Sequence, residues 1–255
     1  MLIRRTINLL ICLLLGLLPL TATAEETVYE HNNNNGLHAI VNVPDAPGNY
    51  AVVVIAPGGE YHMGLPIIQS LANELAEQGI ASIRFNWRSQ SRGEKVDMTN
   101  MAPQKQDMAD AIKLALAHAH IDADRVILAG KSFGSIVALD AFKATPDALG
   151  AILLTPVCEP PMDLDTLYPD VQTTDRPVAV ILGDNDWLCP VPSYYGQTTT
   201  ANANLKTMMV SGDHGFVPPG IEGESAATHP ATLENVDAIT AMAVYWIKTI
   251  LANNP

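Results

Sequence analysis

The sequence predicts an α/β fold in which a mostly parallel sheet is covered by helices on both faces, giving three layers. Apolar, β-branched runs alternate with segments of helical periodicity over residues 37–251, and the crossovers between successive runs are long enough to hold a helix. At 255 residues and 48% apolar composition, the chain can bury one substantial core. We therefore expect a single domain over residues 25–255.

The first part of this pattern predicts three strands and one helix. Residues 37–43 are expected to form a half-exposed strand, and the apolar run 50–56 (YAVVVIA) a strand buried on both faces. A segment of helical character over 66–78 is followed by Gly79, a residue suited to the end of a helix. The third strand covers residues 80–85.

The second part of the chain repeats the alternation. Residues 101–120 carry apolar side chains at helical spacing, and a short apolar strand at 125–129 leads into a helix at 133–143. The remaining apolar runs predict strands at 151–155, 177–182 and 205–210, and a last helix at 231–251.

One segment, residues 156–176, departs from this order. It carries four prolines and five acidic residues and shows little periodicity. It is either a long loop or a small cap over the site, and we favour the cap because loops of this length inside compact domains are often functional.

The first 24 residues have the features of a secretory signal peptide. Arg4 and Arg5 precede an apolar run from residue 9 to residue 18, and Ala22-Thr23-Ala24 provides a cleavage site. The run falls short of the roughly 20 apolar residues that a spanning helix needs. We therefore expect an exported protein, periplasmic or secreted, without stable membrane insertion after cleavage.

Cleavage would leave an acidic chain with two cysteines. The mature chain keeps 12 basic and 27 acidic residues, a net charge of −15, which argues against nucleic acid as a partner. Cys158 and Cys189 either pair, as an oxidising compartment allows, or stay as buried thiols. The sequence leaves both alternatives open.

The strongest chemical signal is the pentapeptide Gly130-Lys131-Ser132-Phe133-Gly134. It directly follows the 125–129 strand and directly precedes the 133–143 helix, which is the strand-turn-helix context in which G-x-S-x-G exposes a serine oxygen above a sheet. The alternative is a serine that merely caps the helix between two glycines. The context favours Ser132 as a nucleophile.

On this motif the chain resembles the α/β-hydrolase superfamily over about residues 37–251. It is most similar to small, nearly capless members such as dienelactone-hydrolase-like esterases. The resemblance implies the three-layer α/β-hydrolase fold and a serine hydrolase, and it implies an oxyanion loop, an acid and a base at further positions.

The oxyanion loop corresponds to Pro57-Gly58-Gly59, after the 50–56 strand. The resemblance implies the backbone N–H of Gly59 as one oxyanion donor and that of Phe133 as the other. Pro57 stands where many relatives have histidine, so Glu60 remains an alternative donor. A plain Pro-Gly-Gly turn is the structural alternative.

The acid and the base follow in the order that the family requires. Asp186 lies in a G-x-x-D pattern after the 177–182 strand and would orient the imidazole, with Asp184 as the alternative. A calcium loop around Asp184 is excluded because Leu188 and Cys189 replace the required oxygen ligand and glycine. His214 follows the 205–210 strand and is the expected base.

Three residues beside the oxyanion loop, Glu60, Tyr61 and His62, either line the substrate mouth or are ordinary loop polarity. The only basic cluster either clamps a substrate carboxylate or is a structural loop, which we favour; it comprises Arg84, Arg88, Arg92 and Lys95.

No metal or organic cofactor is expected. His118 and His120 are two positions apart on a predicted helix and so should face different sides, which argues against a shared metal. We expect a small-molecule acyl substrate, with a carboxylic ester as the default bond. A thioesterase or peptidase, or a ligand-binding protein that has lost catalysis, are the alternatives, and the oligomeric state is left open.

Overall fold

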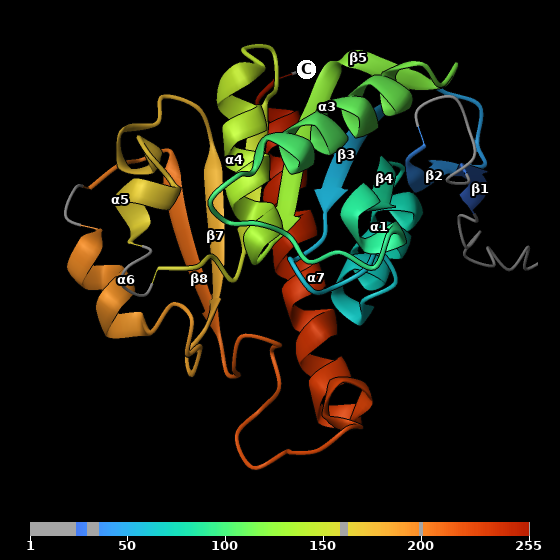
Figure 1. Ribbon diagram of the computed structural model, residues 1–255. Coiled ribbons are helices and arrows are strands. Elements are labelled where there is room, and N and C mark those ends of the chain that lie inside the picture. Colours follow the sequence, from blue (N-terminus) through green and yellow to red (C-terminus); the bar gives the residue numbers. More distant parts are fainter. Residues whose placement is uncertain (1–23, 30–35, 159–162, 199–200, 255) are drawn as a thin grey trace, which may run out of the picture.

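The computed structural model describes residues 24–29, 36–158, 163–198 and 201–254 of the chain (Figure 1). The predicted signal peptide, apart from Ala24, lies outside these residues. Within them, no helix combines the length and apolarity that crossing a membrane requires.

Eight strands form one sheet in the order β1-β2-β4-β3-β5-β6-β7-β8. β1 and β2 pair antiparallel, as do β2 and β4, and all other neighbours are parallel, so the predicted mostly parallel sheet is confirmed. The strands are β1 Ala24–Tyr29, β2 His38–Pro44, β3 Tyr50–Ala56, β4 Ala81–Asn86, β5 Ile121–Lys131, β6 Gly150–Leu154, β7 Val178–Gly183 and β8 Leu205–Val210.

Helices cover both faces of the sheet, as predicted. The core divides into two clusters, one with side chains of α1 and α7 and the other with side chains of α3 and α4. The helices are α1 Pro66–Glu77, α2 Arg88–Ser91, α3 Ala102–Leu116, α4 Phe133–Ala144, α5 Leu164–Leu167, α6 Val191–Gln197 and α7 Pro230–Ala252.

The two clusters meet across the central strands. In β3, Val53 packs in the cluster of α1 and α7, whereas the next residue, Val54, packs in the cluster of α3 and α4, and both are fully buried. Successive side chains of a strand point to opposite faces, so an uninterrupted apolar run is what a sheet covered on both sides demands.

Two boundaries differ from the sequence expectation by more than two residues. The helix predicted over residues 101–120 ends at Leu116, because the chain turns there and Ile121 already pairs with Tyr50 of β3. The strand predicted at 125–129 therefore runs from Ile121 to Lys131. The polar side chains of Asp122 and Asp124 concealed its start.

The described residues of the 156–176 segment pack against the core. The described residues 163–176 contain α5 and a short 3-10 helix at Val171–Thr173, and α5 contacts α6. Tyr168 is fully buried, and its hydroxyl lies 2.8 Å from the Ser135 Oγ of α4. This hydrogen bond anchors the segment to the helix that follows Ser132.

Candidate active site

Four loops meet at the carboxyl ends of parallel strands. The Pro57-Gly58-Gly59 loop follows β3 and Ser132 follows β5, while Asp186 and His214 follow β7 and β8. In open α/β sheets, ligands bind at the carboxyl ends of strands, so this edge is where a site is expected.

The turn after β5 holds Ser132 in a strained backbone conformation. Its φ is +54° and ψ is −124°, values that a residue with a side chain rarely adopts. A Cβ at Gly130 would lie 2.1 Å from the Gly134 carbonyl oxygen, and one at Gly134 would lie 2.3 Å from that of Pro57. Both glycines are therefore required for the turn to close.

Ser132, His214 and Asp186 form a continuous hydrogen-bonded chain. His214 Nε2 lies 2.8 Å from Ser132 Oγ, and His214 Nδ1 lies 3.0 Å from each carboxylate oxygen of Asp186. The three residues are buried, with 7% of Ser132, 3% of His214 and 2% of Asp186 exposed. This arrangement lets a proton leave the serine hydroxyl for the imidazole.

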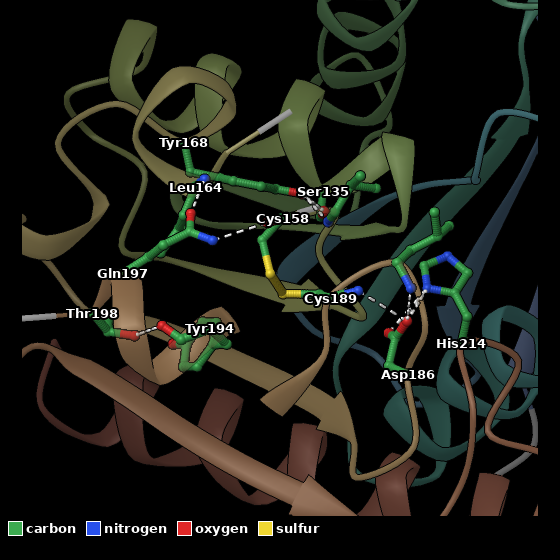
Figure 2. The surroundings of a disulfide bond; sticks show 12 residues. Ser135, Cys158, Leu164, Tyr168, Asp186, Cys189, Tyr194, Gln197, Thr198 and His214 are labelled. Carbon is green, nitrogen blue, oxygen red and sulfur yellow. Dashed lines mark hydrogen bonds and ion pairs between the residues drawn. A yellow bond between two sulfur atoms is a disulfide. The ribbon is translucent and has the colours of Figure 1, made fainter. Parts of the chain in front are cut away.

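The carboxylate of Asp186 is held by its own loop. Its Oδ1 accepts hydrogen bonds from the backbone N–H groups of Leu188 at 2.8 Å and Cys189 at 3.2 Å. Figure 2 shows this carboxylate between Cys189 and His214. The alternative acid, Asp184, instead accepts from the Gly212 N–H at 2.9 Å and shapes the turn beside it.

The same loop is joined to the segment after β6 by a disulfide. Cys158 and Cys189 are bonded and fully buried, and the Cys158 N–H donates to the Leu188 carbonyl oxygen at 2.9 Å (Figure 2). Of the two alternatives left by the sequence, pairing is the one found. One half of the disulfide, Cys189, is thus itself a donor to Asp186.

Burial lowers the pKa of His214 below its ordinary value. The hydrogen bond that His214 Nδ1 donates to Asp186 raises this pKa, and the charge of Lys131 lowers it further. A lowered pKa keeps the imidazole neutral near pH 7, which is the form that can accept a proton.

The glycine loop after β3 borders the serine turn. A Cβ at Gly58 would lie 3.4 Å from Ser132 Cβ, and one at Gly59 would lie 3.5 Å from Phe133 Cβ. The Gly58 carbonyl accepts a hydrogen bond from Trp87 Nε1 at 3.0 Å. Among the described residues, the backbone N–H groups of Gly59 and Phe133 have no hydrogen-bond acceptor. Both are free to donate to a substrate oxygen.

An open cavity of about 590 Å³ adjoins this loop. Most of the side chains around it are polar: it is lined by His38, Gly59, Glu60, His62, Asn86, Gln90, Ser91, Glu94 and Lys95. Trp187 is 65% exposed, and its ring centroid lies 5.9 Å from that of His214. No motif in the sequence pointed to Trp187.

Of the three residues predicted to line the substrate mouth, two line the cavity and one does not. Glu60 and His62 line the cavity, whereas the ring of Tyr61 covers a different group, the Nζ of Lys131, which lies 5.3 Å from its centroid. Lys131 was missed because its position inside the pentapeptide carries no sequence signal for burial.

The basic cluster has carboxylate partners throughout. Arg84 pairs with Glu26, Arg88 with Asp107 and Asp110, Arg92 with Glu94, and Lys95 with Glu60. These pairs support the structural interpretation over the substrate clamp.

His118 and His120 do not lie on a helix, contrary to the sequence expectation. They lie beyond the end of α3, so the two side chains are not held on different sides of a helix. Their ring centroids are 6.0 Å apart. Within the described ranges, no group of three or more His, Cys, Asp or Glu side chains is arranged to hold a metal ion.

Comparison with known proteins gives the same family that the sequence motifs resemble. The model of the alpha/beta hydrolase domain family matches residues 49–243. No curated protein matches the chain.

Solved structures share the fold at low sequence identity. An alpha-beta serine hydrolase homologue from Coxiella burnetii is similar with a TM-score of 0.63 at 16% identity, over 86% of this chain and 96% of that one. A proposed alpha/beta hydrolase from Agrobacterium tumefaciens is similar with a TM-score of 0.65 at 18% identity, over 90% of this chain and 97% of that one. A proposed dienelactone hydrolase from Klebsiella pneumoniae subsp. pneumoniae is similar with a TM-score of 0.63 at 16% identity, over 89% of this chain and 98% of that one.

Proposed function

Since this chain belongs to the alpha/beta hydrolase domain family, we propose that it is a serine hydrolase that cleaves a carboxylic ester or a related acyl bond. Ser132 is the nucleophile, His214 the base and Asp186 the acid that orients it. The observation that carries the proposal is the 2.8 Å separation of His214 Nε2 from Ser132 Oγ, continued at 3.0 Å to Asp186.

The first half of the reaction forms an acyl-enzyme. His214 Nε2 takes the proton of the Ser132 hydroxyl as Oγ bonds to the acyl carbon, and the carbonyl electrons move onto oxygen. The N–H groups of Gly59 and Phe133 stabilise this oxyanion. His214 then returns the proton to the leaving oxygen as its bond to carbon breaks, which releases the alcohol.

The second half removes the acyl group by the same route. A water molecule loses a proton to His214 as its oxygen attacks the acyl carbon, and the intermediate collapses as His214 protonates Ser132 Oγ. The carboxylic acid leaves. Throughout, Asp186 accepts a hydrogen bond from Nδ1 and stabilises the imidazolium when it forms.

The cavity beside Gly59 supports a small or medium acyl compound as the substrate. Its volume of about 590 Å³ suits a small molecule, and its polar lining suits one that carries hydrogen-bonding groups. The exposed Trp187 offers an apolar surface beside His214.

Hydrolysis of a graded ester series tests the proposal. Nitrophenyl acetate, butyrate and octanoate, with matching thioesters and peptide anilides, are assayed with the wild type and Ser132→Ala. We expect turnover of the shorter esters and a loss of about 10³-fold or more in kcat for the variant. Equal turnover by the two proteins would refute the role of Ser132.

We also propose that residues 1–24 direct export and that residues 25–255 form the mature, single-domain enzyme. The Cys158–Cys189 disulfide supports this, because such bonds persist in oxidising compartments. Mass spectrometry of the N-terminus of the protein recovered from the producing cells should find a chain that begins at Glu25.

A further inference from the structure

Lys131 is a buried cation beside Ser132, and the mechanism above gives it no role. Its side chain is fully buried. Moving an ammonium group out of water is costly, so a lysine is retained at such a place only where particular groups compensate.

Two hydrogen bonds join Lys131 to the loops that follow β6 and β8. Its Nζ donates to the backbone carbonyl oxygen of His214 at 2.6 Å and to the Thr155 hydroxyl. Lys131 ends β5, Thr155 follows β6, and His214 lies in the loop after β8. One side chain therefore connects the serine turn to the loop that carries the candidate base.

Two aromatic rings enclose the same ammonium group. Tyr61, beside the oxyanion loop, and Phe216, from the His214 loop, each have their ring centroid 5.3 Å from Nζ. A cation in this position is attracted by the ring faces. The enclosure separates Nζ from solvent.

The charged groups around Lys131 are Asp186, Asp213 and the imidazole of His214. Burial lowers the pKa of Lys131 to about 7, while Asp186 and Asp213 raise it. Because the pKa of His214 is itself lowered from 6.5, Lys131 carries its charge in the pH range where His214 titrates.

A direct part in bond making does not fit this geometry. Nζ contacts the backbone of His214 rather than its ring, and its second contact is Thr155 rather than Ser132. We propose that Lys131 is a positioning residue, which anchors the His214 loop so that the imidazole stays between Ser132 and Asp186. This inference rests on the proposed hydrolase function.

The test compares Lys131→Met with the wild type and with a matched control. Arg84→Met also removes a buried cation, but its guanidinium binds Glu26 and the Met63 carbonyl instead of the candidate site. For each protein, kcat and KM are measured from pH 4.5 to 9, and amide hydrogen exchange is followed in residues 211–217.

Lys131→Met should leave the His214 carbonyl without its donor. We expect kcat to fall by about 10- to 100-fold with KM within about threefold, as for loss of a buried hydrogen bond that leaves its acceptor unpaired. The acid limb of kcat/KM should move to higher pH, because the cation that lowers the pKa of His214 is gone. Exchange in residues 211–217 should rise about tenfold or more. Arg84→Met should lower thermal stability and leave these three readouts at wild-type values.

Thr155→Val supplies a second variant in case Lys131→Met does not fold. Valine keeps the shape of threonine but cannot accept the hydrogen bond from Nζ. We expect kcat to fall about two- to fivefold, with KM unchanged. When both substitutions fold, the double variant should be no slower than Lys131→Met alone, since the two residues act through one contact.

Specific results would overturn the positioning role. A folded Lys131→Met protein with wild-type kcat, acid limb and loop exchange would do so, as would wild-type kcat in Thr155→Val if Lys131→Met is unfolded. Labelling of the wild type by a fluorophosphonate separates this failure from that of the proposed function. A labelled wild type with unaffected variants refutes only the role of Lys131, whereas an unlabelled wild type refutes both.

Discussion

At the scale of single residues, the account depends on which atoms face the imidazole of His214. Both oxygens of Asp186 lie 3.0 Å from Nδ1, so that nitrogen carries a proton and Nε2 is left to accept one from Ser132. Two backbone N–H groups hold the carboxylate in this orientation, and Lys131 holds the opposite side of the histidine through its carbonyl.

Substitution of Asp186 and of Asp184 in turn shows which of the two carboxylates orients His214. Asp186→Asn offers an amide to Nδ1 and favours the wrong tautomer, so kcat should fall by about 10³- to 10⁴-fold. Asp184→Asn is the matched control, because asparagine keeps the oxygen that accepts from Gly212 N–H. The assay is ester hydrolysis at saturating substrate. A larger loss in Asp184→Asn than in Asp186→Asn would reverse the assignment.

The pH dependence of kcat/KM follows from the lowered pKa of His214. The base acts only when neutral, so kcat/KM should rise with pH through a midpoint below 6.5 and then level off. The free energy of unfolding should also depend on pH in the range where His214 titrates. Between 6.5 and the lower native pKa, the unfolded state binds more protons, so stability falls as the pH falls. A midpoint above 7 would contradict the geometry around His214.

At the scale of elements, the site is made by close contacts between loops. The serine turn packs so tightly on the β3 loop that a Cβ at Gly134 would lie 2.3 Å from the Pro57 carbonyl oxygen. The turn that exposes Ser132 and the loop that supplies the Gly59 N–H are thus one packed unit. Neither can move without displacing the other.

Gly134→Ala should separate these two loops. The added methyl meets backbone atoms that cannot rotate away, so we expect the free energy of unfolding to fall by about 3 kcal/mol or more. Gly196→Ala is the control, because a Cβ there meets nothing within 4 Å in α6 and alanine favours a helix. Urea unfolding of both variants measures the difference. Equal stability would show that the turn relaxes more easily than its contacts imply.

The disulfide ties the Asp186 loop to the segment after β6. Replacing Cys158 and Cys189 together by serine should lower the free energy of unfolding by about 3 to 4 kcal/mol, on chain-entropy grounds for a separation of 31 residues. Because Cys189 N–H also donates to Asp186, kcat should fall several-fold with little change in KM. Unaltered kcat in the folded double variant would show that the Asp186 loop keeps its place unaided.

At the scale of the whole molecule, the alternation of apolar runs and helical segments was enough to predict the fold. It worked because buried parallel strands are apolar throughout and lie between helices, a pattern visible in residues 50–56. It failed where polar residues mask a strand, as at Asp122 and Asp124, and where a strand pairs outside the repeat, as β1 does with β2.

Much of the candidate site was also predictable from spacing along the chain. Ser132, Asp186 and His214 each follow a strand, and the carboxyl ends of parallel strands meet at one edge. The burial of Lys131 and its contact with His214 were not predictable. They depend on which loops pack over residue 131, and these come from residues 70 positions before it and 83 after it.

The reactivity of the Ser132 oxygen is the central claim, and covalent labelling tests it most directly. After treatment with a fluorophosphonate, intact mass measurement and peptide fragmentation should find one adduct, on Ser132, formed far more slowly in a His214→Ala variant. Absence of an adduct on the folded wild type, or an adduct on another residue, would contradict the account.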